Sequence, residues 1–128
     1  MSTIKVNNLQ NASGGSNSTP EEIEQGRAKA WVNFKGTSTV TILDDFNVST
    51  ITDHSTGQYT VTFSNAMSNA NYAFTGINSS DGDNGNDSVV SKHGGTDVTT
   101  SALRVRVTKT IDGSYTDKNH TTVIIFGD

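Results

Sequence analysis

The stretch that decides the fold runs from Ala28 to Phe63, with the sequence AKAWVNFKGTSTVTILDDFNVSTITDHSTGQYTVTF. Its first strand-like run places Ala30, Val32 and Phe34 on one side, as expected for a strand with one buried face. Farther along, two strand-like runs flank a polar turn in which Gly57 provides the positive φ of a hairpin. The stretch therefore predicts antiparallel strands, and it contains no group of residues suited to catalysis.

The rest of the chain repeats this pattern of short strands between polar turns. Ser, Thr, Asn and Gly supply 59 of the 128 residues, and Thr favours strands whereas the other three favour turns. Further strands are expected at Tyr72–Ile77, Ser88–Ser91, Ala102–Thr110 and Thr121–Phe126. Seven or eight such strands predict an all-β fold, an antiparallel β-sandwich.

The N-terminal part differs in composition, which divides the chain into a connector or oligomerisation segment at 1–27 and a sandwich domain at 28–128. A short strand is expected at Thr3–Val6. A helix should begin after Thr19, because Thr19 and Glu22 have the spacing of a capping box.

This helix is too short to persist alone in water, so we expect it to pack against something. Its single strongly apolar residue, Ile23, is too little to fix it to its own domain. We therefore expect Ile23 to contact a neighbouring subunit.

Two further positions raise the question of a subunit interface. Trp31 falls on the polar side of its strand, and the last strand is apolar on both faces, so that Ile124 and Phe126 point away from the core side. A subunit contact is the leading interpretation for Trp31, Ile124 and Phe126. Trp31 has two alternative interpretations: it packs in the core after a local bulge, or it forms a platform on which a sugar stacks. For the last strand, the alternative is that it is the central strand of a sandwich.

Charge and composition exclude several classes of partner. The net charge is −4 and the pI about 5.2, so the chain has no basic field for nucleic acid. It has no cysteine, no signal-peptide pattern at its start and no apolar run long enough to cross a bilayer. We expect a soluble protein that is made in the cytoplasm and does not insert into membranes.

Several pieces of the sequence resemble a segment found near the C-termini of bacteriophage tail fibres and fibre-like proteins. Together these pieces span about half of the chain, and no resemblance extends to 78–101. The pieces are STPEEIEQGR at 18–27, AKAWVNF at 28–34, DFNVS at 45–49, ITD at 51–53, GQYTVTF at 57–63, ANYA at 70–73 and VIIFGD at 123–128.

The resemblance implies a β-rich homotrimeric domain on the outside of a virion, such as a tail fibre or another appendage. It also implies binding to a host surface glycan, polysaccharide or lipopolysaccharide, during adsorption, and contact with other tail or virion proteins. A structural tail or capsid component that binds no receptor is the alternative. The resemblance specifies no particular sugar and no binding residues.

Ligand contacts are expected in the long polar region 79–97, because recognition residues concentrate on loops held by a rigid scaffold. The candidate ligand-binding residues are Asp81, Asp83, Asn84, Asn86, Asp87, Lys92 and His93. A solvated polar loop without a ligand is the alternative interpretation of the acidic part. Calcium is a further alternative ligand, but the spacing does not fit an EF-hand loop.

Nothing in the sequence indicates an enzyme. No G-x-S-x-G motif occurs, and Asp44 and Asp45, adjacent in a predicted corner, are poorly placed as facing carboxylates of a glycosidase. His54, His93 and His120 are too far apart in sequence to form a metal motif, and three copies of one histidine at a trimer axis are the alternative metal site. We expect a binding or structural protein without cofactor or metal.

Overall fold

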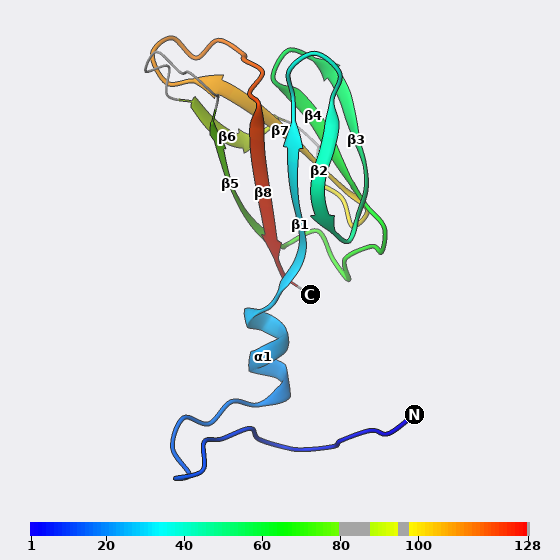
Figure 1. The fold of residues 1–128 in the computed structure, drawn as a ribbon, viewed down its shortest axis with the longest axis vertical. Coiled ribbons are helices and arrows are strands. Elements are labelled where there is room, and N and C mark those ends of the chain that lie inside the picture. Colours follow the sequence, from blue (N-terminus) through cyan, green and yellow to red (C-terminus); the bar gives the residue numbers. More distant parts are fainter. Residues whose placement is uncertain (80–87, 95–97, 128) are drawn as a thin grey trace.

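Two four-stranded antiparallel sheets face each other in a β-sandwich (Figure 1). The structure is a computed structural model that describes residues 1–79, 88–94 and 98–127. The first sheet has the order β2-β1-β8-β5, with bounds Thr41–Phe46, Ala28–Lys35, His120–Phe126 and Ala73–Ser79. The second has the order β3-β4-β7-β6, with bounds Val48–Ser55, Gln58–Phe63, Ala102–Lys109 and Ser88–Lys92. The predicted all-β sandwich is confirmed.

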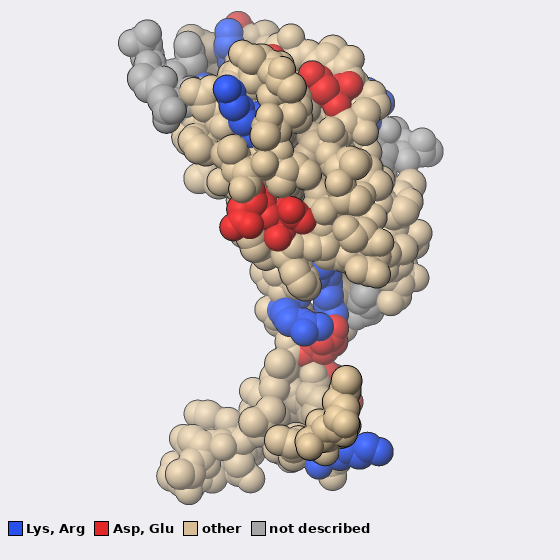
Figure 2. All heavy atoms as spheres, turned by 45° about the vertical axis from the view of Figure 1, so that its right-hand side comes forward, with Lys and Arg blue, Asp and Glu red and all other residues tan. Residues whose placement is uncertain are grey.

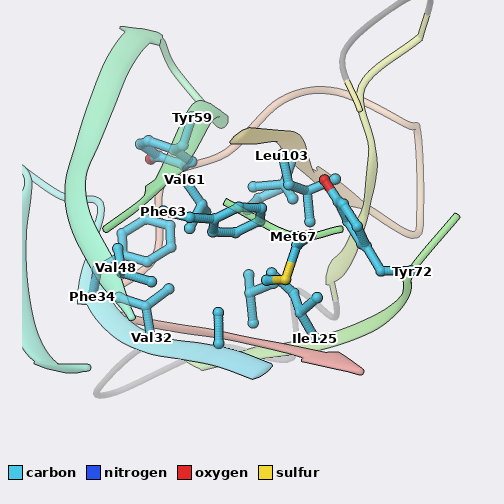
Figure 3. Close-up of a cluster of buried hydrophobic side chains, with 14 residues drawn as sticks. Val32, Phe34, Val48, Tyr59, Val61, Phe63, Met67, Tyr72, Leu103 and Ile125 are labelled. Carbon is cyan, nitrogen blue, oxygen red and sulfur yellow. The ribbon is translucent and has the colours of Figure 1, made fainter. Parts of the chain in front are cut away.

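The core lies between the sheets and is built by the alternation seen in the sequence. Fourteen apolar residues form a buried cluster, and Val32, Phe34 and Ile125 from the first sheet meet residues such as Tyr59 and Leu103 from the second (Figure 3). The rings of Phe34 and Tyr59 meet edge to face, with centroids 5.0 Å apart. Such side chains stabilise a fold of this size by removing apolar surface from water.

The four strands predicted after Phe63 occur within one or two residues of their expected bounds, but one corner lies elsewhere than expected. Asp44 and Asp45 belong to β2, and the chain turns instead at Asn47, whose φ is 56°. Asn tolerates this left-handed conformation better than most residues. The Asn47 side chain then fixes the corner, because its amide nitrogen donates to the carbonyl oxygens of Lys29 at 3.0 Å and Asn65 at 3.1 Å.

The N-terminal segment extends from the lower end of the sandwich, and its helix α1, Pro20–Gly26, lies below β1 (Figure 1). The capping box between Thr19 and Glu22 is present, as predicted. The predicted strand at Thr3–Val6 is wrong: these residues form no strand, and Leu9 and Ser18 form an isolated bridge instead. No residue of α1 is buried.

Candidate functional site

The strand directions give the sandwich two different ends. The N-terminal segment and the C-terminus leave at the lower end in Figure 1. The connections β1–β2, β3–β4 and β7–β8 lie at the opposite end, which we call the distal end. Loops grouped at one end of a rigid sandwich are a common location for binding residues.

Tyr59 ties these three distal connections together from below. Its ring is fully buried, and its hydroxyl donates to the carboxylate of Asp117 in the β7–β8 connection. The same hydroxyl lies 3.4 Å from the carbonyl oxygen of Gly36 in the β1–β2 connection. Asp117 also accepts the backbone N–H of Gly57 in the β3–β4 turn, at 2.7 Å. We call this group the Tyr59 tie.

The two glycines of the Tyr59 tie leave no room for a side chain. Gly57 has a φ of 65°, as the sequence predicted, and a Cβ there would lie 2.5 Å from the carbonyl oxygen of Val107. A Cβ on Gly36 would lie 2.3 Å from the Tyr59 hydroxyl. Burial, followed by the neighbouring Asp117, raises the pKa of Tyr59 above that of an exposed tyrosine. The phenol therefore remains a neutral donor.

Two more contacts join the β1–β2 and β7–β8 connections. Gly36 donates its N–H to the carbonyl oxygen of Lys118 at 2.8 Å, and the Thr37 hydroxyl donates to the Asn119 side-chain oxygen at 2.7 Å. At the surface of the same end, Ile111 is 81% and Tyr115 40% exposed. The distal end thus combines fixed loop bases with exposed apolar and aromatic tips, which sequence reasoning missed because both residues lie in a polar segment.

Most of the predicted ligand-binding residues lie outside the described residues: Asp81, Asp83, Asn84, Asn86 and Asp87. The chain on either side of them is held at the distal end. The side-chain nitrogen of Asn78 donates to the carbonyl oxygen of Ser88 at 3.3 Å, and the Ser88 hydroxyl donates to the Asn78 side-chain oxygen.

Lys92 and His93 do not lie at the same end as Ser88. The strand β6 runs away from the distal end. Lys92 is four residues after Ser88 on this strand, and at about 3.3 Å per residue the two lie about 13 Å apart. His93 directly follows β6 and still pairs with β7, because its N–H donates to the carbonyl oxygen of Arg104 at 3.1 Å. In the described part of region 79–97, the strand β6 therefore separates Ser88 from His93, close to the strand expected at Ser88–Ser91. The assignment of ligand contacts to this region stays a prediction.

The predicted interface residues of the sandwich lie together on the outward side of the first sheet. Trp31 is in register with Phe46 on β2 and with Ile124 on β8, and both Trp31 and Ile124 are partly buried by these neighbours. Ile77 and Phe126 on the same side are 72% and 37% exposed. We call these five residues the outer apolar face.

The outward side of the second sheet has a different character. Thr52, Thr60 and Arg104 lie in register across β3, β4 and β7, so polar side chains replace the apolar row of the first sheet. Ile23, the remaining predicted interface residue, lies on α1 with 45% of its surface exposed, and the structure does not bring it to the outer apolar face. An apolar face on only one of two sheets is typical of an assembly surface.

A second site, which sequence reasoning did not find, lies where α1 meets the sandwich. A hollow of about 410 Å³ is lined by Arg27, Ala28, Lys29, Phe46, Asn47 and residues 64–68. Figure 2 shows basic and acidic side chains gathered at this narrowing. We call it the neck hollow. It combines three segments that are distant in sequence, so no local motif indicates it.

In the described part of the chain, neither a metal-binding cluster nor a membrane-spanning helix was found. At 1–79, 88–94 and 98–127, no three His, Cys, Asp or Glu side chains are grouped so that they could hold a metal. The helix found there is too short to cross a membrane. Comparison of the chain with protein-family models, with curated proteins and with solved structures gave no match.

Proposed function

We propose that the chain is a virion fibre-tip protein that binds a host cell-surface glycan, polysaccharide or lipopolysaccharide, through its distal end. In this proposal it acts as a homotrimeric binding protein without enzymatic activity. The N-terminal segment connects it to other tail or virion proteins. The proposal starts from the resemblance to phage tail fibres and is developed from the arrangement of the two ends.

The observation that carries the proposal is the Tyr59 tie, placed at the end opposite the N-terminal segment. One buried phenol holds the bases of three loops through Asp117, Gly36 and Gly57. Loops that are already ordered lose little conformational freedom when they bind, which favours binding. A protein attached at its lower end would present this surface outward to a host cell.

The proposed trimer is supported by the outer apolar face. Charged residues are usually depleted and aromatic residues enriched in the centre of subunit interfaces. Trp31 and Phe46 adjoin in register there, next to Ile124. Burying Trp31, Ile124 and Phe126 of this face between subunits would remove exposed apolar surface. It would leave free both the distal end and Phe46, which lies on the edge strand β2.

A structural virion component without receptor binding is the second candidate. It is favoured by the same outer apolar face and by the exposed N-terminal segment, because these two features suffice for assembly. The two candidates differ only in whether the distal end has a ligand.

The test is the binding of the labelled full-length protein to a panel of lipopolysaccharides and capsular polysaccharides extracted from bacteria. We expect saturable binding to at least one of them. A double variant, Ile111→Ser with Tyr115→Ser, should lose this binding at least about tenfold, since well-packed aromatic anchors commonly contribute more than 1 kcal/mol.

The matched control is Leu43→Ser, which removes a 48% exposed apolar residue from the strand β2 and leaves the distal connections themselves unchanged. It should bind as the unmodified protein does. Equal binding by the control and the distal variant would refute the distal site. Binding to no polysaccharide, together with co-purification with a tail or capsid protein, would favour the structural candidate.

A further inference from the structure

The neck hollow has the size and composition of a small-molecule site. Its volume of about 410 Å³ falls within the range of about 300–1,000 Å³ that such sites occupy. Two cations, Arg27 and Lys29, line it together with the ring of Phe46, which is 49% exposed. The remaining lining includes Ser64, Asn65 and Ser68, whose side chains can form hydrogen bonds, together with apolar residues such as Ala66 and Met67.

The side of the hollow next to β1 and β3 is rigidly built. The Asn47 side-chain oxygen accepts the backbone N–H of Asn65 at 2.8 Å, and Ser64 donates its N–H to the Asn47 carbonyl oxygen at 3.1 Å. Met67, at the other end of this loop, is buried and donates its N–H to the carbonyl oxygen of Thr100 at 2.8 Å. The lining is therefore held in place before any ligand arrives.

A carboxylate that lies beside the neck hollow, and does not line it, already binds both of its cations. Glu24 of α1 accepts from the Lys29 ammonium, and its two oxygens lie 3.1 and 2.8 Å from a guanidinium nitrogen of Arg27. The Lys29 side chain is only 13% exposed, so most of this side chain is shielded from solvent. The hydrogen bond from Lys29 lowers the pKa of Glu24, with Arg27 contributing in the same direction. The pair of cations is thus arranged to hold a carboxylate.

Glu24 is a replaceable partner. It lies on a seven-residue helix with no buried residue, and helices of this length have little stability of their own. The Arg27–Glu24 pair is exposed on both sides, and such pairs contribute little to stability, with typical values of about 0–1 kcal/mol. Another carboxylate can therefore take its place without disturbing the core.

We propose that the neck hollow binds a carboxylate-bearing sugar residue, with Lys29 and Arg27 holding the carboxylate and Phe46 packing against the sugar ring. Asn65, Ser64 and Ser68 offer hydrogen bonds to the sugar hydroxyls. In this arrangement Glu24 is an internal competitor that leaves the cations when the sugar binds. The site is separate from the distal end and does not depend on a ligand there.

The experiment is an NMR titration of the full-length, ¹⁵N-labelled protein with galacturonate and, as a neutral match, with galactose. Galacturonate should cause saturable shifts at the amides of Phe46, Asn65 and Ser68, and galactose should cause none. Glu24→Gln should bind galacturonate at least about threefold more tightly, because the internal carboxylate is removed.

Lys29→Met should weaken galacturonate binding about tenfold or more, since charge-assisted hydrogen bonds are the strong ones. Lys35→Met is the matched control, because it makes the same substitution on β1 at the other end of the strand. A well-dispersed spectrum for each variant establishes that it is folded.

Three results would overturn the proposal. These are equal shifts with galactose and galacturonate, equal effects of Lys29→Met and Lys35→Met, and no saturable shift in Glu24→Gln up to about 50 mM ligand, which excludes even millimolar affinity. None of them bears on polysaccharide binding at the distal end, which the Ile111 and Tyr115 variant tests. The two proposals can therefore fail independently.

Discussion

Replacing Tyr59 with Phe should destabilise the sandwich by about 2 kcal/mol. The substitution keeps the buried ring, its edge-to-face contact with Phe34 and the core volume, and it removes only the hydroxyl. A hydrogen bond to a charged group contributes about 1.5–3 kcal/mol. Asp117 keeps the N–H of Gly57 at 2.7 Å, so its carboxylate is not left without a donor. The expected loss therefore lies in the middle of that range.

Urea and thermal unfolding measure this loss. The midpoint should fall without a change in the denaturant slope, and Tm should fall by about 6–10 °C for a domain of this length. Tyr115→Phe is the control, because Tyr115 is 40% exposed, and it should change the free energy of unfolding by less than about 0.5 kcal/mol. A Tyr59→Phe loss as small as that of the control would refute the assigned role of the hydroxyl.

Alkaline pH gives a second measure of the same contact. Burial and the Asp117 carboxylate raise the pKa of Tyr59 above its value of about 10 in an unfolded chain. Above pH 10 the unfolded chain therefore releases this proton while the folded chain keeps it, so the free energy of unfolding falls as pH rises. Burial also raises the pKa of Tyr72, to about 12, which adds to the slope. Tyr59→Phe should flatten the slope and leave the part due to Tyr72.

Three further substitutions test other parts of the structure. Gly57→Ala should cost about 1–3 kcal/mol, because the φ of 65° and a carbonyl oxygen 2.5 Å from the new Cβ both oppose it, whereas Gly94→Ala, with open space around it, should unfold at nearly the same urea concentration as the parent. Asn47→Gly removes the side-chain hydrogen bonds, but glycine still adopts the positive φ easily. Asn47→Ala removes the same hydrogen bonds and also opposes the positive φ, so it should lower Tm further. The difference in Tm between the two variants measures the conformational cost alone. Phe126→Asp should give a monomer of 13.6 kDa by light scattering if the outer apolar face joins subunits. Val89→Asp, on the outward side of the other sheet, should keep the parent mass, and a parent that is itself a monomer would contradict the assembly proposal.

The strands were predictable because their signal is local. Apolar alternation at Ala30, Val32 and Phe34 specifies the buried face of β1 without reference to any other segment. The Thr19–Glu22 capping box and the turn at Gly57 likewise depend on residues a few positions apart. The Thr3–Val6 prediction failed because two apolar residues in a polar segment offer too little surface to pair or bury.

The functional surfaces were less predictable because they combine distant segments. Tyr59 and Asp117 are 58 positions apart, and an aspartate in a polar loop gives no sign that it will meet a buried phenol. The neck hollow joins Lys29 to Phe46 and to the loop after β4 for the same reason. The outer apolar face was foreseen in part, since Trp31 and Ile124 break the expected polar side of their strands, but the contribution of Ile77 required the register of β5.

The way the Tyr59 tie is made also bears on how freely the distal loops can change in sequence. Two of its contacts use backbone groups, the carbonyl oxygen of Gly36 and the N–H of Gly57, and only Tyr59 and Asp117 contribute side chains. The loop tips beyond these anchors therefore carry little of the stability of the sandwich. A lineage of such proteins could exchange tip residues such as Ile111 one after another and acquire new specificities while the core stays the same.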